Sequence, residues 1–214
     1  MALVKGTNCG FVTVAPTSDP GEITHTEVDN HAVAIIGTTP AGVIKITEIG
    51  WWCDTATEAA NFEVAIYVWG SYKPGAIIGV SRTNAKGTSA GWKRAAGLDI
   101  TLEPETKYYI AVQLDNTNTT TYSNYSTENV SGEKTMNDDN VDTLPDPWTD
   151  YTWIEKLVGI YALVETEAPV GTNIKINIAD DFKDVESMKI NIGDVWKDVA
   201  EVKQNIGDAW KVVY

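Results

Sequence analysis

Apolar and polar side chains alternate with a period of two along most of the first 167 residues, and this pattern most constrains the fold. The clearest runs are 62–69 and 108–114, in which every even-numbered position is apolar. Side chains two residues apart lie on one face of a β-strand, so each run predicts a strand with one buried face. Further strands are expected at 32–36, 43–53, 76–82, 98–102 and 153–164. Many short strands separated by Gly/Pro turns predict an all-β fold, an antiparallel β-sandwich or jelly roll.

The alternation changes phase inside the expected strand 43–53. Ile44 and Ile46 share one phase, and Trp51 falls on the other. A β-bulge inserts one extra residue into a strand and would reconcile the two phases near Glu48. We therefore expect Trp51 to point inward and Trp52 outward.

A second pattern fills the C-terminal part of the chain. Segments that begin at Asn177, Asn191 and Asn205 repeat every 14 residues, and they share Asn, Ile, Asp, an aromatic residue, Lys and Val at fixed offsets. The stretch 168–174 before them has the Pro, Gly and small polar residues of a linker. We predict a β-sandwich domain at 1–167, a linker at 168–174 and three repeats at 175–214.

Two structures fit the 14-residue period. Lys-Ile-Asn-Ile followed by Gly-Asp and Val-Trp-Lys-Asp predicts a β-hairpin with a two-residue turn. Two heptads also span 14 residues, so a coiled coil is the alternative, although Gly193 and Gly207 would then lie within helices. Either unit is small and needs neighbours, which predicts a homo-oligomer, with a trimer as the expected symmetry. The expected contact residues are Ile192, Val195, Trp196, Val199, Ile206 and Trp210.

The charge balance excludes two classes of partner. Lys and Arg number 16 against 30 Asp and Glu, a net charge of −14, which disfavours nucleic acid and anionic membranes. Residues 168–214 carry six Lys and eight Asp or Glu, so the acidity lies mainly in the first domain. The N-terminus lacks the apolar stretch of a secretory signal, and no window has the length of a membrane span. We expect no signal peptide and no membrane insertion.

Few residues suggest catalysis. The chain has two histidines, His25 and His31, and no nucleophile or nucleotide-binding motif in its required context. So acidic a chain could contain a glycosidase-type pair of carboxylates, but no motif supports such a pair. We therefore expect that the protein is not an enzyme. Cys9 and Cys53 are expected to be buried free thiols, with a single disulfide as the alternative.

One acidic cluster suits a hard metal ion. Asp138, Asp139 and Asp142 offer carboxylates at short spacing, as calcium prefers, and no other cofactor is expected. A solvated polar loop is the other interpretation. The preceding run, 115–131, is rich in Asn, Thr and Ser and predicts a long surface loop or a mobile hairpin.

Aromatic residues are the most informative type, with Trp 8 and Tyr 9 against Phe 3. Trp and Tyr combine a flat apolar face with a polar group and are typical of recognition surfaces, including those that stack on sugars. Outward strand positions and the following turn give a candidate glycan platform of Trp52, Tyr67, Trp69 and Tyr72. A neighbouring subunit or the C-terminal repeats could cover the same side chains instead.

Two segments resemble known families. Lys73-Pro-Gly-Ala-Ile-Ile78, Gly91-Trp-Lys93 and the strand ending Tyr108-Tyr-Ile-Ala-Val112 resemble a β-sandwich module of extracellular and surface-adhesion proteins. The copies of Asn-Ile-Gly-Asp-x-Trp-Lys resemble repeats that end many structural proteins of tailed phages and prophages.

The resemblances together imply a virion protein. They imply a bacteriophage structural subunit, either a capsid decoration or a fibre or tail appendage, that assembles in the host cytoplasm with other virion proteins and contacts host surface glycans. A carbohydrate-binding adhesin module is the alternative, and a glycan-degrading enzyme is a third hypothesis.

Overall fold

The chain is all-β, as the alternation predicts. The computed structural model describes residues 3–21, 23–28, 31–56, 61–114, 120–126, 135–139, 141–154, 157–166, 175–178, 181–184, 189–192, 195–198, 203–206 and 209–212. No helix occurs in these ranges, and so none there could span a membrane. The chain divides into two compact units, Met1–Thr166 and Glu167–Tyr214.

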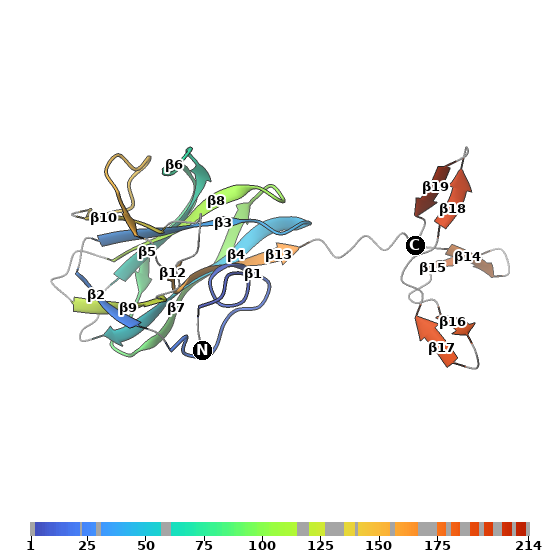
Figure 1. The fold of residues 1–214 in the computed structure, drawn as a ribbon, viewed down its shortest axis with the longest axis horizontal. Helices are drawn as coiled ribbons and strands as arrows, with labels where there is room; N and C mark the ends of the chain where they lie inside the picture. The colour runs from blue at the N-terminus through green and yellow to red at the C-terminus, as the bar shows by residue number, and fades with distance from the viewer. Residues whose placement is uncertain are drawn as a thin grey trace. The chain divides into compact units, whose positions relative to one another are not determined.

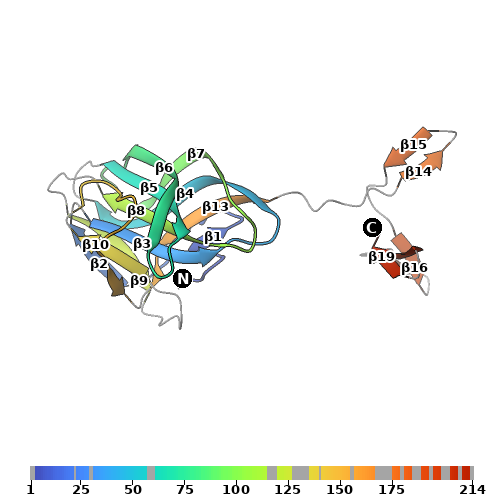
Figure 2. The same ribbon diagram turned by 90° about the horizontal axis from the view of Figure 1, so that it is seen from above.

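The first unit is a sandwich of two sheets (Figure 1). The seven-stranded sheet contains β1 (Gly10–Val12), β2 (Ile23–Val28), β4 (Val43–Ala56), β7 (Gly91–Thr101), β9 (Thr120–Ser126), β12 (Leu157–Val158) and β13 (Ile160–Thr166). The six-stranded sheet contains β3 (His31–Thr38), β5 (Asn61–Trp69), β6 (Pro74–Ala85), β8 (Lys107–Leu114), β10 (Thr135–Asp139) and β11 (Thr152–Ile154). Its order is β11-β10-β3-β8-β5-β6, and Figure 2 shows β6, β5, β8 and β3 side by side in this sequence.

Alternating side chains of both sheets fill one core. Phe62, Val64 and Ile66 of β5 lie in it, as the alternation predicts. Trp51 of β4 reaches them from the other sheet, and its ring meets that of Phe62 edge-on with centroids 5.9 Å apart. The large apolar area buried between the two layers is the main stabilising contribution to the sandwich.

The predicted bulge in β4 is confirmed. In the pairing of β4 with β13, Leu163 pairs with Glu48 and Val164 with Ile46, which leaves Thr47 as the extra residue. The pairing of β4 with β7 also shifts register at this point, but there the extra residues, 97–99, belong to β7. Ile46 and Ile49 are therefore both fully buried although they are three residues apart. The bulge restores the phase that brings Trp51 inward.

The outer face of the seven-stranded sheet is closed by a polar and aromatic cluster. Tyr161 of β13 pairs with Gly50 of β4 and lies against its Cα, where an added Cβ would come within 2.5 Å of the phenol ring. The Tyr161 hydroxyl donates to Glu48 and accepts from Nε of Arg94 at 2.9 Å. Burial and the Glu48 carboxylate raise the pKa of this phenol. Trp92 packs edge-on against Tyr161 at 5.2 Å, so the ring is held on several sides.

Two polar segments, one expected to be a long loop or a hairpin and the other a calcium site or a solvated loop, contain strands of the sandwich. Residues 120–126 of the polar run form β9, which pairs with β2, β4 and β12. Residues 135–139 form β10, which pairs with β3 and β11. Neighbouring strands supply the backbone hydrogen bonds, and Thr and Tyr are good strand formers, so polar composition did not prevent pairing. The rest of 115–131 lies outside the described residues.

Each C-terminal repeat forms a two-stranded antiparallel hairpin in its described residues. The strand pairs are β14 (Lys175–Ile178) with β15 (Asp181–Asp184), β16 (Lys189–Ile192) with β17 (Val195–Asp198), and β18 (Lys203–Ile206) with β19 (Ala209–Val212). Two residues separate the strands of each pair, as the hairpin interpretation predicts. The coiled-coil alternative is not what these segments form.

Candidate functional site

An open groove of about 480 Å³ lies on the outer face of the six-stranded sheet. Aromatic side chains dominate its lining. The lining residues are Ile36, Trp69, Tyr72, Lys107, Tyr109, Tyr151 and Trp153. They come from β3, β5, β8 and β11, from the turn after β5 and from the chain before β11.

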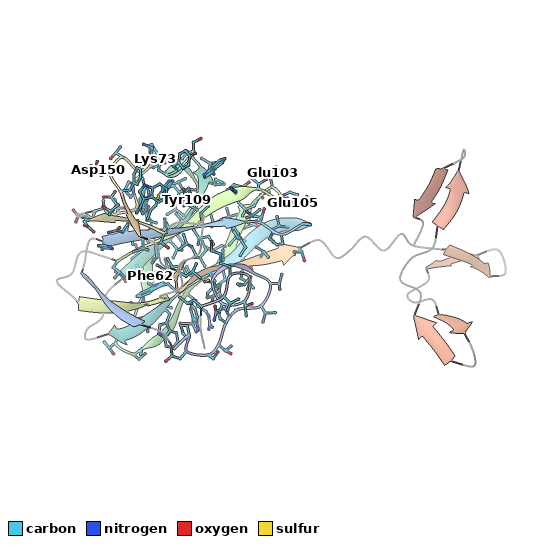
Figure 3. All side chains as sticks on the ribbon, in the orientation of Figure 1. Phe62, Lys73, Glu103, Glu105, Tyr109 and Asp150 are labelled. Atoms are coloured by element: carbon cyan, nitrogen blue, oxygen red, sulfur yellow. The ribbon has the colours of Figure 1, made fainter. Side chains whose placement is uncertain are left out.

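Strand register assembles the floor of the groove. Tyr109 of β8 pairs with Ile36 on one side and with Tyr67 on the other, so these side chains form a row across the outer face. Trp69 lies two residues after Tyr67 in β5, and Lys107 lies two residues before Tyr109 in β8. Both side chains therefore point to the same outer face. Figure 3 shows Tyr109 on this outer face and Phe62 between the two sheets.

Lys107 and Trp69 are in direct contact. The Lys107 Nζ lies 5.2 Å from the centroid of the Trp69 ring, within the range of a cation–π interaction. The contact orders the lysine stem beside the indole. An ammonium group placed over a ring keeps N–H donors for other partners, because it has three of them.

One wall is formed by residues 141–151, which we call the strap. The strap crosses the outer face and is held by hydrogen bonds to the sheet: the Tyr67 hydroxyl donates to the Pro145 carbonyl at 2.8 Å, and the Ile77 N–H donates to Asp146 Oδ1 at 2.9 Å. At the strap's end, Tyr151 meets Trp153 edge-on, with ring centroids 5.6 Å apart. The wall therefore presents two aromatic rings to the groove.

A carboxylate at the edge of the sheet fixes the start of the strap. Glu63 Oε2 accepts from the Thr143 hydroxyl at 2.8 Å and from the Leu144 N–H at 2.9 Å, and it also pairs with Arg82. Three donors on one carboxylate oxygen make this a charge-assisted anchor.

Several lining aromatics are exposed. Tyr72 is 71% exposed, Trp69 45% and Tyr151 36%, values well above those of core aromatics. Tyr72 also has a backbone φ of +113°, and its neighbour Ser71 has +58°. Bulky residues rarely adopt positive φ, which costs about 1–3 kcal/mol and is concentrated at functional sites. The turn thus holds an apolar ring in solvent at an energetic cost.

Tyr109 stays neutral at ordinary pH. It is almost fully buried in the floor, and burial raises the pKa of its phenol to about 12. The lining therefore contributes one cation, Lys107, and no carboxylate among the residues that the structure describes.

Two of the four predicted platform residues are not exposed. Tyr67 lies on the outer face, as expected, but the strap covers it completely, and Trp148 packs on its ring. Trp52 also points away from the core, yet it is 8% exposed and packs against Trp92. Trp52 and Tyr67 therefore do not belong to an exposed platform: they are covered, as the alternative interpretation allowed, but by parts of the first unit itself, because strand phase gives the face and not what covers it. Trp69 and Tyr72 do line the groove.

The other lining residues were missed by sequence reasoning. Alternation along β8 places Lys107 and Tyr109 on one face, and Tyr151-Thr-Trp153 is rich in aromatics. Neither signal relates the two segments, which meet only through sheet pairing and the strap.

The three predicted calcium ligands lie in different environments. Asp138 and Asp139 are adjacent in β10, so their side chains point to opposite faces. Asp139 Oδ1 accepts from Nδ1 of His31 at 2.7 Å, whereas burial raises the pKa of Asp138. Asp142 is exposed. In the described ranges no three His, Cys, Asp or Glu side chains come together to hold a metal ion, and calcium binding stays a prediction.

The predicted oligomerisation residues lie in the hairpins. Ile192 pairs with Val195 across the second hairpin, next to the turn, and Ile206 has the same place in the third. Trp196 and Trp210 each pair with an asparagine. Val199 lies outside the described residues.

Comparisons with known proteins add little to this geometry. The sequence matches no family model and no curated protein. The structure is similar to the cysteine protease and lectin-like domains of Cwp84, a surface layer associated protein of Clostridium difficile, with 15% identity and a TM-score of 0.48 over 66% of this chain. A structure of the same clostridial protease after propeptide cleavage gives 14% identity and a TM-score of 0.46 over 70%. This chain spans 34% and 41% of those two chains.

Proposed function

We propose that the sandwich is a glycan-binding module and that the aromatic groove is its binding site. The observation that carries the proposal is the combination of Trp69, Tyr72 and Tyr151, all exposed, around one open groove. Flat apolar rings stack on the C–H faces of sugar rings, while hydroxyl and indole groups bind sugar hydroxyls. A volume of about 480 Å³ suits a few sugar units.

The rigidity of the groove supports this role. Tyr109 and Trp153 belong to paired strands, and the strap is tied to the sheet by hydrogen bonds from the Tyr67 hydroxyl and the Ile77 N–H. A preformed site loses little conformational entropy on binding, which weakly interacting sugar ligands require.

The test is glycan-array binding by the full chain. The double variant Trp69→Ala/Tyr72→Ala should lose at least tenfold in binding, while its unfolding midpoint changes little because both side chains are substantially exposed. Val14→Ala is the matched control, since Val14 is exposed at 74% and lies outside the groove. An array without hits, or hits retained by the double variant, would refute the proposal.

We also propose that the glycan-binding sandwich is the head of a virion appendage or capsid decoration, assembled through the repeats. The observation that favours this role is the tandem hairpins, because a two-stranded hairpin alone is marginally stable and needs a partner surface. Three similar units in a row offer such surfaces repeatedly, either to a second copy of the chain or to another virion protein.

Truncation tests the assembly role. A chain ending at Glu167 keeps the whole first unit and should be folded and monomeric by light scattering, whereas the full chain should form a closed oligomer, with a trimer expected. A truncated chain that stays oligomeric would contradict the role of the repeats. Mass spectrometry of purified particles would test the virion assignment directly.

A further inference from the structure

We propose that the glycan bound in the groove carries an acidic group, and that Lys107 binds this group while the sugar rings stack on the neighbouring aromatics. The inference rests on the proposed glycan-binding function and specifies its ligand as an anionic oligosaccharide, with a carboxylate, sulfate or phosphate on a sugar.

The first argument is the charge of the lining. Lys107 is the one charged side chain among the described residues that line the groove, and the others are aromatic or aliphatic. The chain as a whole carries 30 acidic and 16 basic residues. A lining whose one charged side chain is a lysine therefore differs from the average surface of this acidic chain, and Lys107 creates a local preference for anions.

Lys107 differs from cations of the first unit that form ion pairs with acidic side chains. Lys45 pairs with Asp99, and Arg82 pairs with Glu63. In the described part of the chain, Lys107 forms no ion pair, and its contact is the face of Trp69. The ring orders the stem without satisfying the three N–H donors. An ordered ammonium with unused donors at the edge of a groove favours a charge-assisted hydrogen bond to a bound anion.

The acidic side chains near the groove do not belong to its lining. Figure 3 shows Asp150 and Glu105 on either side of Tyr109 in the view, and neither residue lines the groove. An anion bound in the groove would therefore meet Lys107 as the one charged side chain of the described lining.

A glycan array printed with matched neutral and acidic oligosaccharides tests the inference. It should include sialylated and glucuronic-acid forms for the carboxylate, and sulfated and phosphorylated forms for the other two anions. The assay uses 0.15 M salt, at which charges more than about 8 Å apart are largely screened. Comparing these three sets identifies which anion the site takes. We expect acidic members to exceed their neutral parents by about fivefold, the size of one partly exposed charge interaction.

Two substitutions at one position isolate the charge. Lys107→Met keeps most of the stem over Trp69 and removes the ammonium, so the ratio of acidic to neutral glycan binding should fall to about one. Lys107→Arg keeps the charge and should retain a preference. Unfolding midpoints of both variants should match the parent chain, because Lys107 is exposed.

The outcomes separate the inference from the function on which it rests. Equal binding of acidic and neutral partners, or an acid preference that survives in Lys107→Met, overturns the inference. Binding that is lost in Trp69→Ala/Tyr72→Ala but shows no acid preference leaves the glycan site standing and refutes its anionic ligand. An array with no hits overturns both.

Discussion

Replacing Gly50 with alanine should destabilise the sandwich, because the space for a Cβ is occupied by Tyr161. The added atom would lie 2.5 Å from Cε1, 2.6 Å from Cζ and 2.7 Å from the hydroxyl oxygen of Tyr161. Contacts below 3 Å require the ring to move. The ring cannot move freely, since Arg94 and Glu48 hold its hydroxyl and Trp92 packs on its side.

The magnitude follows from two opposing effects. Overpacking a well-filled site lowers the free energy of unfolding by about 1–3 kcal/mol. We expect a cost in the upper half of this range, because displacement of Tyr161 also disturbs hydrogen bonds to charged groups. Alanine also lowers the conformational entropy of the unfolded chain relative to glycine, which stabilises the folded state by about 0.4–1 kcal/mol. We expect Gly50→Ala to lower the free energy of unfolding by about 2 kcal/mol, which corresponds to a fall in Tm of about 4–8 °C for a domain of this size.

Urea denaturation of the full chain, followed by tryptophan fluorescence, measures this change, and a double-mutant cycle identifies its cause. In the background Tyr161→Leu the rigid ring is absent, so the same glycine substitution should cost less than about 0.5 kcal/mol. The reasoning would be refuted by an equal cost in both backgrounds, or by a Gly50→Ala variant as stable as the parent.

Three further predictions concern the strap, the groove floor and the thiols. Tyr67→Phe removes the donor to the Pro145 carbonyl and should cost about 1–2 kcal/mol in urea denaturation, whereas a change below 0.5 kcal/mol would mean that this bond does not hold the strap. The pKa of Tyr109 is raised to about 12, above its unfolded value near 10, so stability that is present below pH 10 should fall as the pH rises toward 12. A phenol absorbance titration should show a late-titrating group that is missing in Tyr109→Phe. Cys9 and Cys53 are buried free thiols, and burial raises the pKa of Cys9 to about 12, so a thiol reagent should label both only after unfolding. Rapid labelling of the folded chain would contradict their burial.

Local patterns in the sequence were sufficient for much of the architecture. Alternation along 62–69 defined a strand and its buried face, and the phase change near Glu48 located a bulge, because side-chain period and pleat are properties of the strand itself. The two-residue Gly-Asp turns similarly indicated hairpins in the repeats. Local polarity did not identify β9 and β10 as strands of the sandwich, because their pairing with distant strands decided their structure.

The binding site was only partly within reach of the sequence. Strand phase placed Tyr67 and Trp69 on one outer face, and that placement holds in the structure. Strand phase could not predict that the strap buries Tyr67 and leaves Trp69 exposed, because Pro145, which contacts Tyr67, is 78 residues away in the sequence. Exposure depends on every segment that crosses a face, and such long-range contacts have no local signature.

The sequence by itself determined the all-β class, the strand faces, the bulge and the repeat period, since each follows from interactions between near neighbours in the chain. Tertiary structure alone decided that Ile36, Trp69, Lys107 and Tyr151 would meet in one groove. Sheet order brings β3, β8 and β5 together, and hydrogen bonds to Tyr67 and Glu63 hold the strap beside them. The physical reason is that a sheet pairs segments distant in sequence, so its outer surface combines side chains whose proximity only the folded pairing creates.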